Sequence, residues 1–549
     1  MGLQKQAKLE DFFALESPHP YGVLPGGNRF FGGNYVSRRS EEIFDDDLWQ
    51  QILAFCDGKT LATVVQSSRY LYVAGHQPEL WRDLVLRRCD EEKADITQVG
   101  SSWKDTYLLI FPPQKKDSNQ EPRYHMHVHT PMEVPGIYSD TLYRSHICRS
   151  FKIPSAWLEP SDGTHKNEVP RVSVDKLTPE EFFEKYERPN YPVIIKGAGK
   201  SRALSEWQDP DYMRQHTAPS ASFRTTSGGA PLPANFTLSA YGGYSNFSYL
   251  EESPLYLFDR TAFNTKQWSD DFFPEFHKQC PYWDPSGTHG HDLLQHLGSE
   301  RRPDHTWLIM GPKRSGSIFH IDPNCTHAWN ACIAGRKRWI LYPPGVTPPG
   351  VYPSADGDEV ALPLSVGEWL TQYWKEHREQ CRKRPPSERP LECTVDPGDV
   401  MFIPHGWWHM VINLDDHNIA ITHNYVSRNN LGNVLKFITD KNDQVSGCRD
   451  RQDSVKPEHL YDEFTKALET MEPEALKEAE AQAQSGWTCN AWKDGKEKGT
   501  PSKENHKAVP TCGVNNKKRS HAPDDETSHE PKSVMAKTEK VAAFSFSFL

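Results

Sequence analysis

Two short segments, far apart in the sequence, each combine strand-like apolar residues with side chains that ligate metals. The first runs from Gly316 to Asp322 (GSIFHID), and in a strand His320 and Asp322, two residues apart, project from the same face. The second, PGDVMFIPHGWWHMVINL, predicts a turn, a buried strand and then a further apolar strand that opens with His409. A fold that unites these three side chains must bring distant strands together, as a β-barrel does.

The two histidines and the carboxylate form a ligand set that suits iron(II). His320, Asp322 and His409 would occupy one face of an octahedral ion and leave the opposite face open for chemistry, whereas structural zinc prefers a closed tetrahedral site. The H-x-D pattern is weak evidence by itself, because a neighbouring His and Asp more often form an ordinary hydrogen-bonded pair. The interpretation therefore depends on what surrounds the three residues.

Lys337 provides a second, independent signal. If residues 336–342 form a strand, Lys337 shares a face with Trp339 and Leu341, and its ammonium group points toward the apolar side. An unpaired buried charge is costly, so a cation in this position requires an anionic partner. The alternative is a lysine whose amine extends from the surface into water.

Three sequence blocks around these residues occur in a characteristic order: HIDPNCTHAWN from His320, GRKRWILYP from Gly335 and PHGWWH ending at His409. They resemble the Jumonji C (JmjC) family, and among its members the arginine demethylase and lysyl hydroxylase subgroup. The resemblance runs from Pro192 to Val426. It implies an α+β fold built on a double-stranded β-helix, the cupin or jelly-roll barrel, with iron(II) as metal, 2-oxoglutarate as cosubstrate and dioxygen as oxidant.

The resemblance also assigns roles to individual residues. The metal ligands would be His320, Asp322 and His409. Lys337 would bind the distal carboxylate of 2-oxoglutarate, and Thr422 would hydrogen-bond the same group. Asn330, Asn424 and Tyr256 are further cofactor-binding candidates, although each fits equally well as a hydrogen-bonded polar residue of the core. Three more polar residues near the ligands are expected to orient the site or to form turns, namely His327, His405 and Asp399.

Helical periodicity dominates residues 41–110, where apolar residues such as Leu48, Leu61 and Leu80 recur at helical spacing. This segment resembles an F-box, including the late Leu80-Trp81 pair and the following Trp103. An F-box implies a Skp-type adaptor of a cullin ubiquitin ligase as partner. The alternative is a helical subdomain that only braces the domain that follows it.

The remaining sequence divides into a flexible arm, a connector, helices and a tail. In the arm, 1–40, Gln6, Leu9, Phe12 and Phe13 resemble the peptide that binds the replication sliding clamp, although an ordinary amphipathic segment has the same pattern. Residues 111–165 are expected to be a connector, 166–440 the JmjC domain and 441–485 C-terminal helices. The tail, 486–549, is expected to be disordered, and its basic cluster 517–519 is a candidate nuclear import signal.

Composition limits the cellular context but not the substrate. No apolar run is long enough to cross a membrane, and the scattered cysteines suggest neither a disulfide framework nor a zinc ribbon, so we expect a soluble intracellular protein, nuclear or nuclear and cytoplasmic. A formal charge of -11 gives no overall attraction to nucleic acid. Three hypotheses stay open: a protein lysyl hydroxylase or arginine or lysine N-demethylase with histones among its candidate substrates, a ubiquitin-ligase receptor that uses its barrel for recognition, and an RNA or small-molecule oxygenase.

Overall fold

A computed structural model describes residues 19–26, 44–94, 96, 98–112, 133–150, 153, 167–226, 234–284, 292–354, 357, 359–449 and 451–484. The clamp-like motif from Gln6 to Phe13 and the basic cluster 517–519 lie outside these residues. Among the described helices, none combines the length and the apolar character that a membrane crossing requires.

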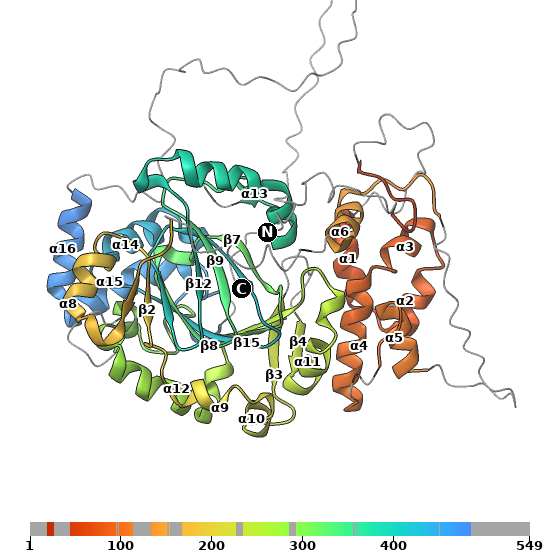
Figure 1. Cartoon of the computed structure of the whole chain (residues 1–549), viewed down its shortest axis with the longest axis horizontal. Coiled ribbons are helices and arrows are strands. Elements are labelled where there is room, and N and C mark those ends of the chain that lie inside the picture. The colour runs from red at the N-terminus through yellow and green to blue at the C-terminus, as the bar shows by residue number, and fades with distance from the viewer. Residues whose placement is uncertain are drawn as a thin grey trace, which may run out of the picture.

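The predicted strands of the JmjC domain pair into two largely antiparallel sheets (Figure 1). The larger sheet has nine strands and the smaller sheet has four. In spatial order the larger sheet contains β1 (Arg171–Ser173), β2 (Val193–Lys196), β13 (Val400–Ile403), β8 (His327–Ala334), β15 (Asn418–Tyr425), β6 (Thr306–Gly311), β5 (Tyr256–Asp259), β3 (Ser222–Thr226) and β4 (Ala234–Thr237). The smaller sheet contains β12 (Leu391–Val395), β9 (Lys337–Tyr342), β14 (Trp408–Asn413) and β7 (Gly316–His320). A separate hairpin is formed by β10 (Tyr352–Pro353) and β11 (Val360–Ala361).

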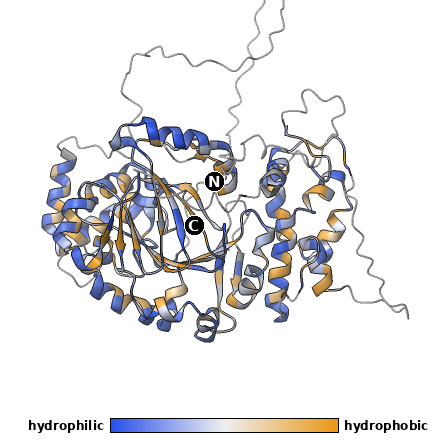
Figure 2. Cartoon of the chain, viewed as in Figure 1, coloured by the Kyte–Doolittle hydropathy of each residue, from blue (hydrophilic) through white to orange (hydrophobic). Residues whose placement is uncertain are grey.

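Consecutive segments alternate between the two sheets, because β7 and β9 belong to the smaller sheet while β6 and β8 belong to the larger one. Most strand residues at the centre of both sheets are buried, and Figure 2 shows hydrophobic residues concentrated in these strands. The two-sheet α+β barrel predicted from the sequence is therefore present.

Helices cover the outside of the barrel. The longest is α13 (Val366–Lys383), which begins at the N-cap residue Ser365 and lies against β7 of the smaller sheet, where Trp369 packs edge-on against Phe319. Its outward face is hydrophilic (Figure 2). The remaining barrel-associated helices are α8 (Pro179–Phe182), α9 (Arg202–Glu206), α10 (Pro210–Gln215), α11 (Leu238–Ser245) and α12 (Lys266–Gln279).

The predicted C-terminal helices are α14 (Leu431–Asp440), α15 (Pro457–Met471) and α16 (Pro473–Gln484). They form a compact bundle at one side of the barrel (Figure 1) with a hydrophobic core of its own, which includes Leu431, Leu460 and Phe464. Val426, directly after β15, and Leu293 belong to the same core. The bundle is thus packed onto the barrel near the ends of its strands.

The helical periodicity of residues 41–110 produces five helices: α1 (Asp46–Ala54), α2 (Gly58–Val64), α3 (Arg69–Ala74), α4 (Pro78–Glu92) and α5 (Trp103–Ile110). A sixth, α6 (Asp140–Ser150), lies within the predicted connector and contacts α1. We call α1–α6 the helical module. Most of its periodic apolar residues are buried, but Leu48 is 38% exposed and therefore lies on the surface instead of in the core.

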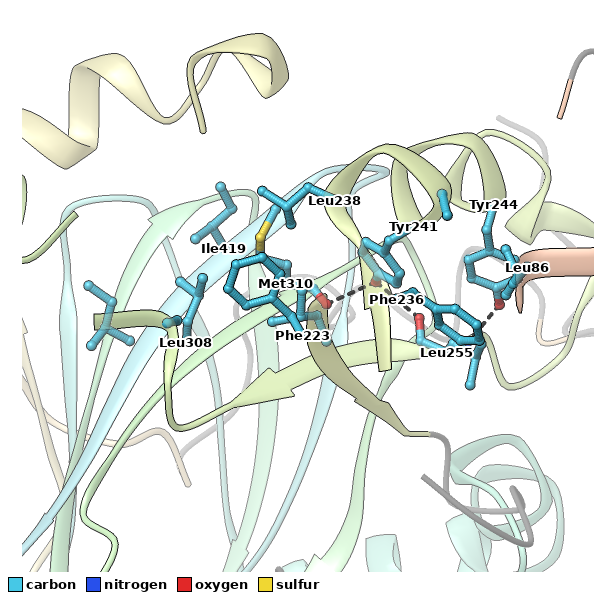
Figure 3. Packing of buried hydrophobic residues seen from close by; sticks show 14 of the residues in the cluster. Leu86, Phe223, Phe236, Leu238, Tyr241, Tyr244, Leu255, Leu308, Met310 and Ile419 are labelled. Atoms are coloured by element: carbon cyan, nitrogen blue, oxygen red, sulfur yellow. Dashed lines mark hydrogen bonds between the residues drawn. The ribbon is translucent and has the colours of Figure 1, made fainter. Parts of the chain in front are cut away.

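The helical module shares a hydrophobic core with the barrel. Figure 3 shows Leu86 of α4 beside Tyr244 of α11, and the cluster continues through Leu255 and Met310 to the larger sheet. The Tyr241 hydroxyl donates hydrogen bonds to the carbonyl oxygens of Leu255 and Met310 at 3.1 and 3.0 Å. The interface is therefore continuous with the interior of the barrel domain.

A buried ion pair crosses the same interface. The guanidinium of Arg82 lies 3.2 Å from the carboxylate of Glu251, which also accepts hydrogen bonds from the indole N–H of Trp103 at 2.9 Å and the hydroxyl of Tyr244 at 2.6 Å. The Glu251 carboxylate, held by donors from three residues, orients the elements that carry them strongly. The module therefore packs on the barrel, which both alternatives for this segment allow.

Candidate metal and cosubstrate site

The register of two neighbouring strands brings the predicted histidine ligands together. In the antiparallel pair of β7 and β14, His320 lies directly opposite His409, and the centroids of the two imidazole rings are 4.1 Å apart. A register irregularity follows between His409 and Val411. Directly opposed residues of an antiparallel pair project from the same face, so both imidazoles point toward the interior of the barrel.

Backbone hydrogen bonds fix which nitrogen of each ring faces the site. Nδ1 of His320 lies 2.8 Å from the carbonyl oxygen of Ile318, and Nδ1 of His409 lies 3.1 Å from that of Trp407. A carbonyl oxygen can only accept, so each Nδ1 carries the proton and each Nε2 has the lone pair that a metal requires. Burial also lowers the pKa of His320 to about 3 and that of His409 to about 4, which keeps both rings neutral.

Asp322 reaches the same point from beyond the end of its strand. The sequence places it in the strand with His320, but β7 ends at His320 and Asp322 directly precedes the short 3-10 turn η10 (Pro323–Cys325). Its Oδ1 lies 3.9 Å from Nε2 of His409. One ligand atom from each of the three residues lies within 4.8 Å of the other two, which is the spacing a single ion can bridge.

One oxygen of the Asp322 carboxylate lacks a hydrogen bond that would compensate for its burial. Its Oδ2 is buried and forms no hydrogen bond within the described part of the chain. Burial raises its pKa to about 6, although the neighbouring His320 opposes that shift. A buried carboxylate oxygen without a donor is costly in a folded protein, and a bound cation would remove the cost. The residues present thus fit a divalent metal ion.

The three residues lie in the wall of a cavity that opens to solvent. Both sheets contribute to it, since β7, β9 and β14 belong to the smaller sheet and β5, β6, β8 and β15 to the larger. All eight predicted site residues line this cavity: Tyr256, His320, Asp322, Asn330, Lys337, His409, Thr422 and Asn424. The barrel therefore brings together every candidate that the sequence proposes.

Lys337 is buried, as the strand parity of β9 predicts, and it lies opposite Asn413 of β14. Within the described residues no carboxylate lies within ion-pairing distance of its amine. Burial lowers its pKa to about 8 because the ammonium form is poorly solvated. A dicarboxylate that binds a metal with one end would supply the missing counter-charge with the other, so the cavity fits 2-oxoglutarate.

Thr422 and Asn330 are directly opposed on β15 and β8. The Thr422 hydroxyl donates to the carbonyl oxygen of Trp329 at 3.1 Å, so it must rotate to donate to a ligand. Asn330 presents a buried Oδ1 that has no partner in the described structure. Tyr256 shares a 3.1 Å hydrogen bond with Ser317, and Asn424 donates to Thr326 at 2.8 Å. Their predicted contacts with the cosubstrate stay predictions.

Other polar residues near the ligands form hydrogen bonds between distant segments of the barrel. The backbone N–H of His405 donates to Nδ1 of His327 at 3.1 Å, which ties the turn before β14 to β8. Asp399 accepts a hydrogen bond from the backbone N–H of Gly197 at 3.0 Å. His423 points away from the cavity, where its ring stacks on Trp329.

Sequence reasoning missed several residues of the cavity wall: Phe258, Trp307, Ser317, Trp339 and Asn413. Two of these form an aromatic wall, because the rings of Phe258 and Trp307 are stacked with centroids 5.7 Å apart and planes 22° from parallel. Strand parity offered a signal for Phe258, which lies two residues after Tyr256 and so faces the same side. Nothing local in the sequence pairs it with Trp307.

A second group of potential ligands, His377, Cys381 and Glu392, also has its ligand atoms within 4.8 Å of one another. Here the carboxylate is already neutralised, because Arg338 and Arg378 lie 2.8 and 2.9 Å from its two oxygens. Its contact with His377 and the charge of Arg338 hold the pKa of Glu392 well below its usual value despite burial. A cation would have to displace the arginines, so this group is a structural network.

Comparison with known proteins agrees with this geometry. The model of the cupin-like domain family matches residues 179–431. The arginine-specific demethylase JMJ22 of Arabidopsis thaliana is 37% identical over 476 residues, which cover 84% of each chain. The bifunctional arginine demethylase and lysyl-hydroxylase psr-1 of Caenorhabditis elegans is 34% identical over 48% of this chain and 63% of its own. The 2-oxoglutarate and iron-dependent oxygenase JMJD4 of Gallus gallus is 28% identical over 49% of this chain and 62% of its own.

The similarity to JMJ22 extends over most of both proteins, and the family match covers the barrel that carries the three ligands. Neutral imidazoles, a carboxylate with one buried oxygen that lacks a donor and a buried lysine that requires an anion are the features that an iron and 2-oxoglutarate site needs. The chain belongs to the JmjC family of cupin-like proteins and is an iron(II)- and 2-oxoglutarate-dependent oxygenase that uses dioxygen.

Proposed function

We propose that this oxygenase acts on a basic side chain of a protein, either by N-demethylation of methylated arginine or lysine or by hydroxylation of lysine, with histones among the candidate substrates. The aromatic wall of the cavity, formed by Phe258 and Trp307, carries the proposal. Cationic groups bind favourably over aromatic faces, and methylated ammonium and guanidinium groups match such walls especially well. The names of the relatives JMJ22 and psr-1 support the same substrate class.

The protein's contribution to the reaction is binding and orientation. When bound, iron(II) with 2-oxoglutarate and dioxygen supplies an oxidant that inserts oxygen into a C–H bond. His320, Asp322 and His409 would hold the metal, and Lys337 would hold the distal carboxylate of the cosubstrate. The aromatic wall would place the target C–H bond toward the metal. Oxidation next to nitrogen releases formaldehyde and leaves a demethylated amine, whereas oxidation elsewhere leaves an alcohol.

The experiment is mass spectrometry of peptides that carry methylated arginine, methylated lysine or unmodified lysine, after incubation with the enzyme, iron(II) and 2-oxoglutarate. Demethylation removes one methylene unit, and hydroxylation adds one oxygen atom. We expect Trp307→Leu to raise KM for the peptide while leaving metal affinity unchanged. Modification of RNA and of none of the peptides would contradict the proposal; the formal charge of -11 already opposes RNA as a substrate.

A second proposal concerns the helical module, whose outer side we propose as a docking surface for a Skp-type adaptor. Leu48 of α1 is 38% exposed, and Phe55, the C-cap residue directly after α1, is 79% exposed. Phe44, also exposed, packs edge-on against Trp49 with ring centroids 5.5 Å apart. Large apolar side chains gathered on one solvent-facing surface are typical of protein interfaces.

Co-purification with a Skp-type adaptor tests this second proposal. Leu48→Asp and Phe55→Asp should abolish the association, and Tyr352→Asp, at an exposed aromatic residue of the barrel domain, serves as the matched control. Trp81 is unsuitable for this test because it is buried and donates a hydrogen bond to the Gly75 carbonyl, so its replacement would disturb the module itself. An adaptor that fails to bind the intact chain would contradict the proposal.

A further inference from the structure

The loop that follows the metal-binding carboxylate has an unfavourable backbone conformation. Directly after Asp322, the turn η10 contains two consecutive non-glycine residues in the left-handed region, Asn324 and Cys325, both with φ of 56°. Each such residue costs about 1 kcal/mol, somewhat less for asparagine, so the surrounding structure must hold this loop in place. The partners that hold it therefore bear on where Asp322 lies.

The first of these partners is a segment of the C-terminal bundle. The side-chain amide of Asn324 donates from Nδ2 to the carbonyl oxygen of Ser446 at 3.1 Å, and the backbone N–H of Ser446 donates to Oδ1 of Asn324 at 3.0 Å. Asn324 is only 6% exposed, so this reciprocal pair is shielded from water. Asparagine both tolerates the left-handed conformation and completes the pair, which no other residue type does as well.

The second partner is Asn430, which directly precedes α14 and is fully buried. Its Nδ2 donates to the carbonyl oxygen of Cys325 at 3.0 Å, while its Oδ1 accepts the backbone N–H of Ser427 at 2.8 Å. Helix α14 packs against η10, and Cys325 packs against the hydrophobic core of the C-terminal bundle. The loop after Asp322 is thus anchored to the bundle from both of its strained residues.

We propose that Asn324 and Asn430 are positioning residues of the metal site, through which the C-terminal bundle holds Asp322 beside His320 and His409. The histidines need no such help, because the register of β7 and β14 fixes them. Asp322 lies outside any strand, and the contacts of the following loop fix its backbone. The inference concerns the metal site alone and holds whichever substrate the enzyme oxidises.

Titration of the metal-free protein with cobalt(II), followed by visible absorption, tests the proposal. Asn324→Gly permits the left-handed backbone but removes the two hydrogen bonds with Ser446. We therefore expect the affinity for cobalt(II) to fall about tenfold or more and the absorption bands to change. Ser446→Ala is the matched control, because Ser446 binds Asn324 only through its backbone N–H and carbonyl oxygen. If the hydrogen bonds with Ser446 only stabilise the fold, Asn324→Gly will lower Tm but leave the cobalt(II) absorption spectrum unchanged, which would contradict the proposal.

Cobalt(II) binding by Asn324→Gly with wild-type affinity and spectrum would overturn the proposal. If that variant does not fold, Asn430→Asp decides, since it keeps the acceptor for Ser427 and replaces the donor to Cys325 with an oxygen that repels the Cys325 carbonyl. Weakened cobalt(II) binding by Asn430→Asp supports the proposal, and unchanged binding overturns it. His320→Ala, which must lose metal affinity in either case, separates failure of this inference from failure of the metal site itself.

Discussion

His320 on β7 and His409 on β14 are directly opposed residues of one antiparallel pair, and their Nδ1 atoms are both held by the carbonyl oxygen two residues earlier in the chain. The same local geometry is thus repeated on two neighbouring strands. It prepares two neutral imidazoles, with Nε2 directed at one point, before any metal arrives. Preorganisation of this kind lowers the cost of metal binding.

Asp322 should be needed for metal binding and unfavourable for the metal-free fold. Asp322→Asn removes a buried carboxylate that has an oxygen without a donor in the described structure. We expect metal affinity to fall by at least about tenfold. The Tm of the metal-free variant should equal or exceed that of the wild type, because a costly buried group is lost. A lower metal-free Tm, measured by differential scanning fluorimetry in the presence of a chelator, would show that Asp322 stabilises the fold by itself.

Lys337 should show the same opposition between binding and stability. Lys337→Met keeps the length of the side chain and removes its buried charge, so the free energy of unfolding of the cosubstrate-free protein should rise by about 1 to 3 kcal/mol. The variant should also lose the increase in Tm that 2-oxoglutarate gives the iron- or manganese-loaded wild type. Equal stabilisation of both proteins by 2-oxoglutarate would exclude Lys337 as the carboxylate partner.

The pH dependence of cosubstrate binding follows from the pKa of Lys337. Burial lowers that pKa from its ordinary value of 10.5 to about 8 in the cosubstrate-free protein. As pH rises through 8 the amine loses its proton and the distal carboxylate loses its counter-charge, so 2-oxoglutarate affinity should fall. Between pH 8 and pH 10.5 this lysine is protonated in the unfolded chain but largely neutral in the folded one. The unfolded chain thus binds more protons, so the cosubstrate-free fold becomes more stable as pH rises through this range. Calorimetry in buffers of different ionisation enthalpy should detect proton uptake by the protein when 2-oxoglutarate binds above pH 8. An affinity for 2-oxoglutarate that stays constant from about pH 7 to 9 would contradict this role of Lys337.

The cluster of His377, Cys381 and Glu392 should hold no metal. Arg338 and Arg378 already neutralise the carboxylate, and Nδ1 of His377 lies 2.7 Å from the hydroxyl of Tyr342. Metal analysis of a His320→Ala, His409→Ala double variant, loaded with cobalt(II) and desalted, should find essentially no bound ion. Retention of one ion per chain would show that this cluster is a second site.

The helical module and the barrel should unfold as one unit. Arg82→Ala leaves the carboxylate of Glu251, which is only 13% exposed, without its cation, which should cost up to about 3 to 5 kcal/mol. Lys266→Ala breaks an exposed ion pair with Asp270 and should cost less than about 1 kcal/mol. Urea denaturation followed by tryptophan fluorescence and by circular dichroism should give coincident transitions. Separate transitions for the two parts would contradict a continuous core.

Sequence periodicity identifies those parts of the site that strands fix. The parity of β9 places Lys337 correctly, and the apolar pattern correctly separates the strand that ends at Ile403 from the one that carries His409. Asp322 differs, because its strand ends two residues earlier than the pattern suggests. Its loop is held by Ser446, 122 residues after Asn324, and by Asn430, 105 residues after Cys325, and no local pattern reports such distant contacts.

The surface of the helical module shows the same limit. Helical spacing correctly predicts α1, and it places Leu48 on the apolar face of that helix. In the structure Leu48 is 38% exposed, whereas Leu53 of the same helix is buried. Periodicity gives the face of a helix, but which part of that face is covered depends on how α4 and α6 pack against it. The stacking of Phe258 on Trp307 is likewise a product of sheet order and not of local sequence.

Formation of succinate from 2-oxoglutarate by the purified chain tests the assignment of the metal site most directly. The wild type and His216→Ala, at an exposed histidine far from the cavity wall, should form succinate only when iron(II) is present. His320→Ala and His409→Ala should not exceed the background of a protein-free reaction. Succinate formation at equal rates by the wild type and both ligand variants would contradict the account.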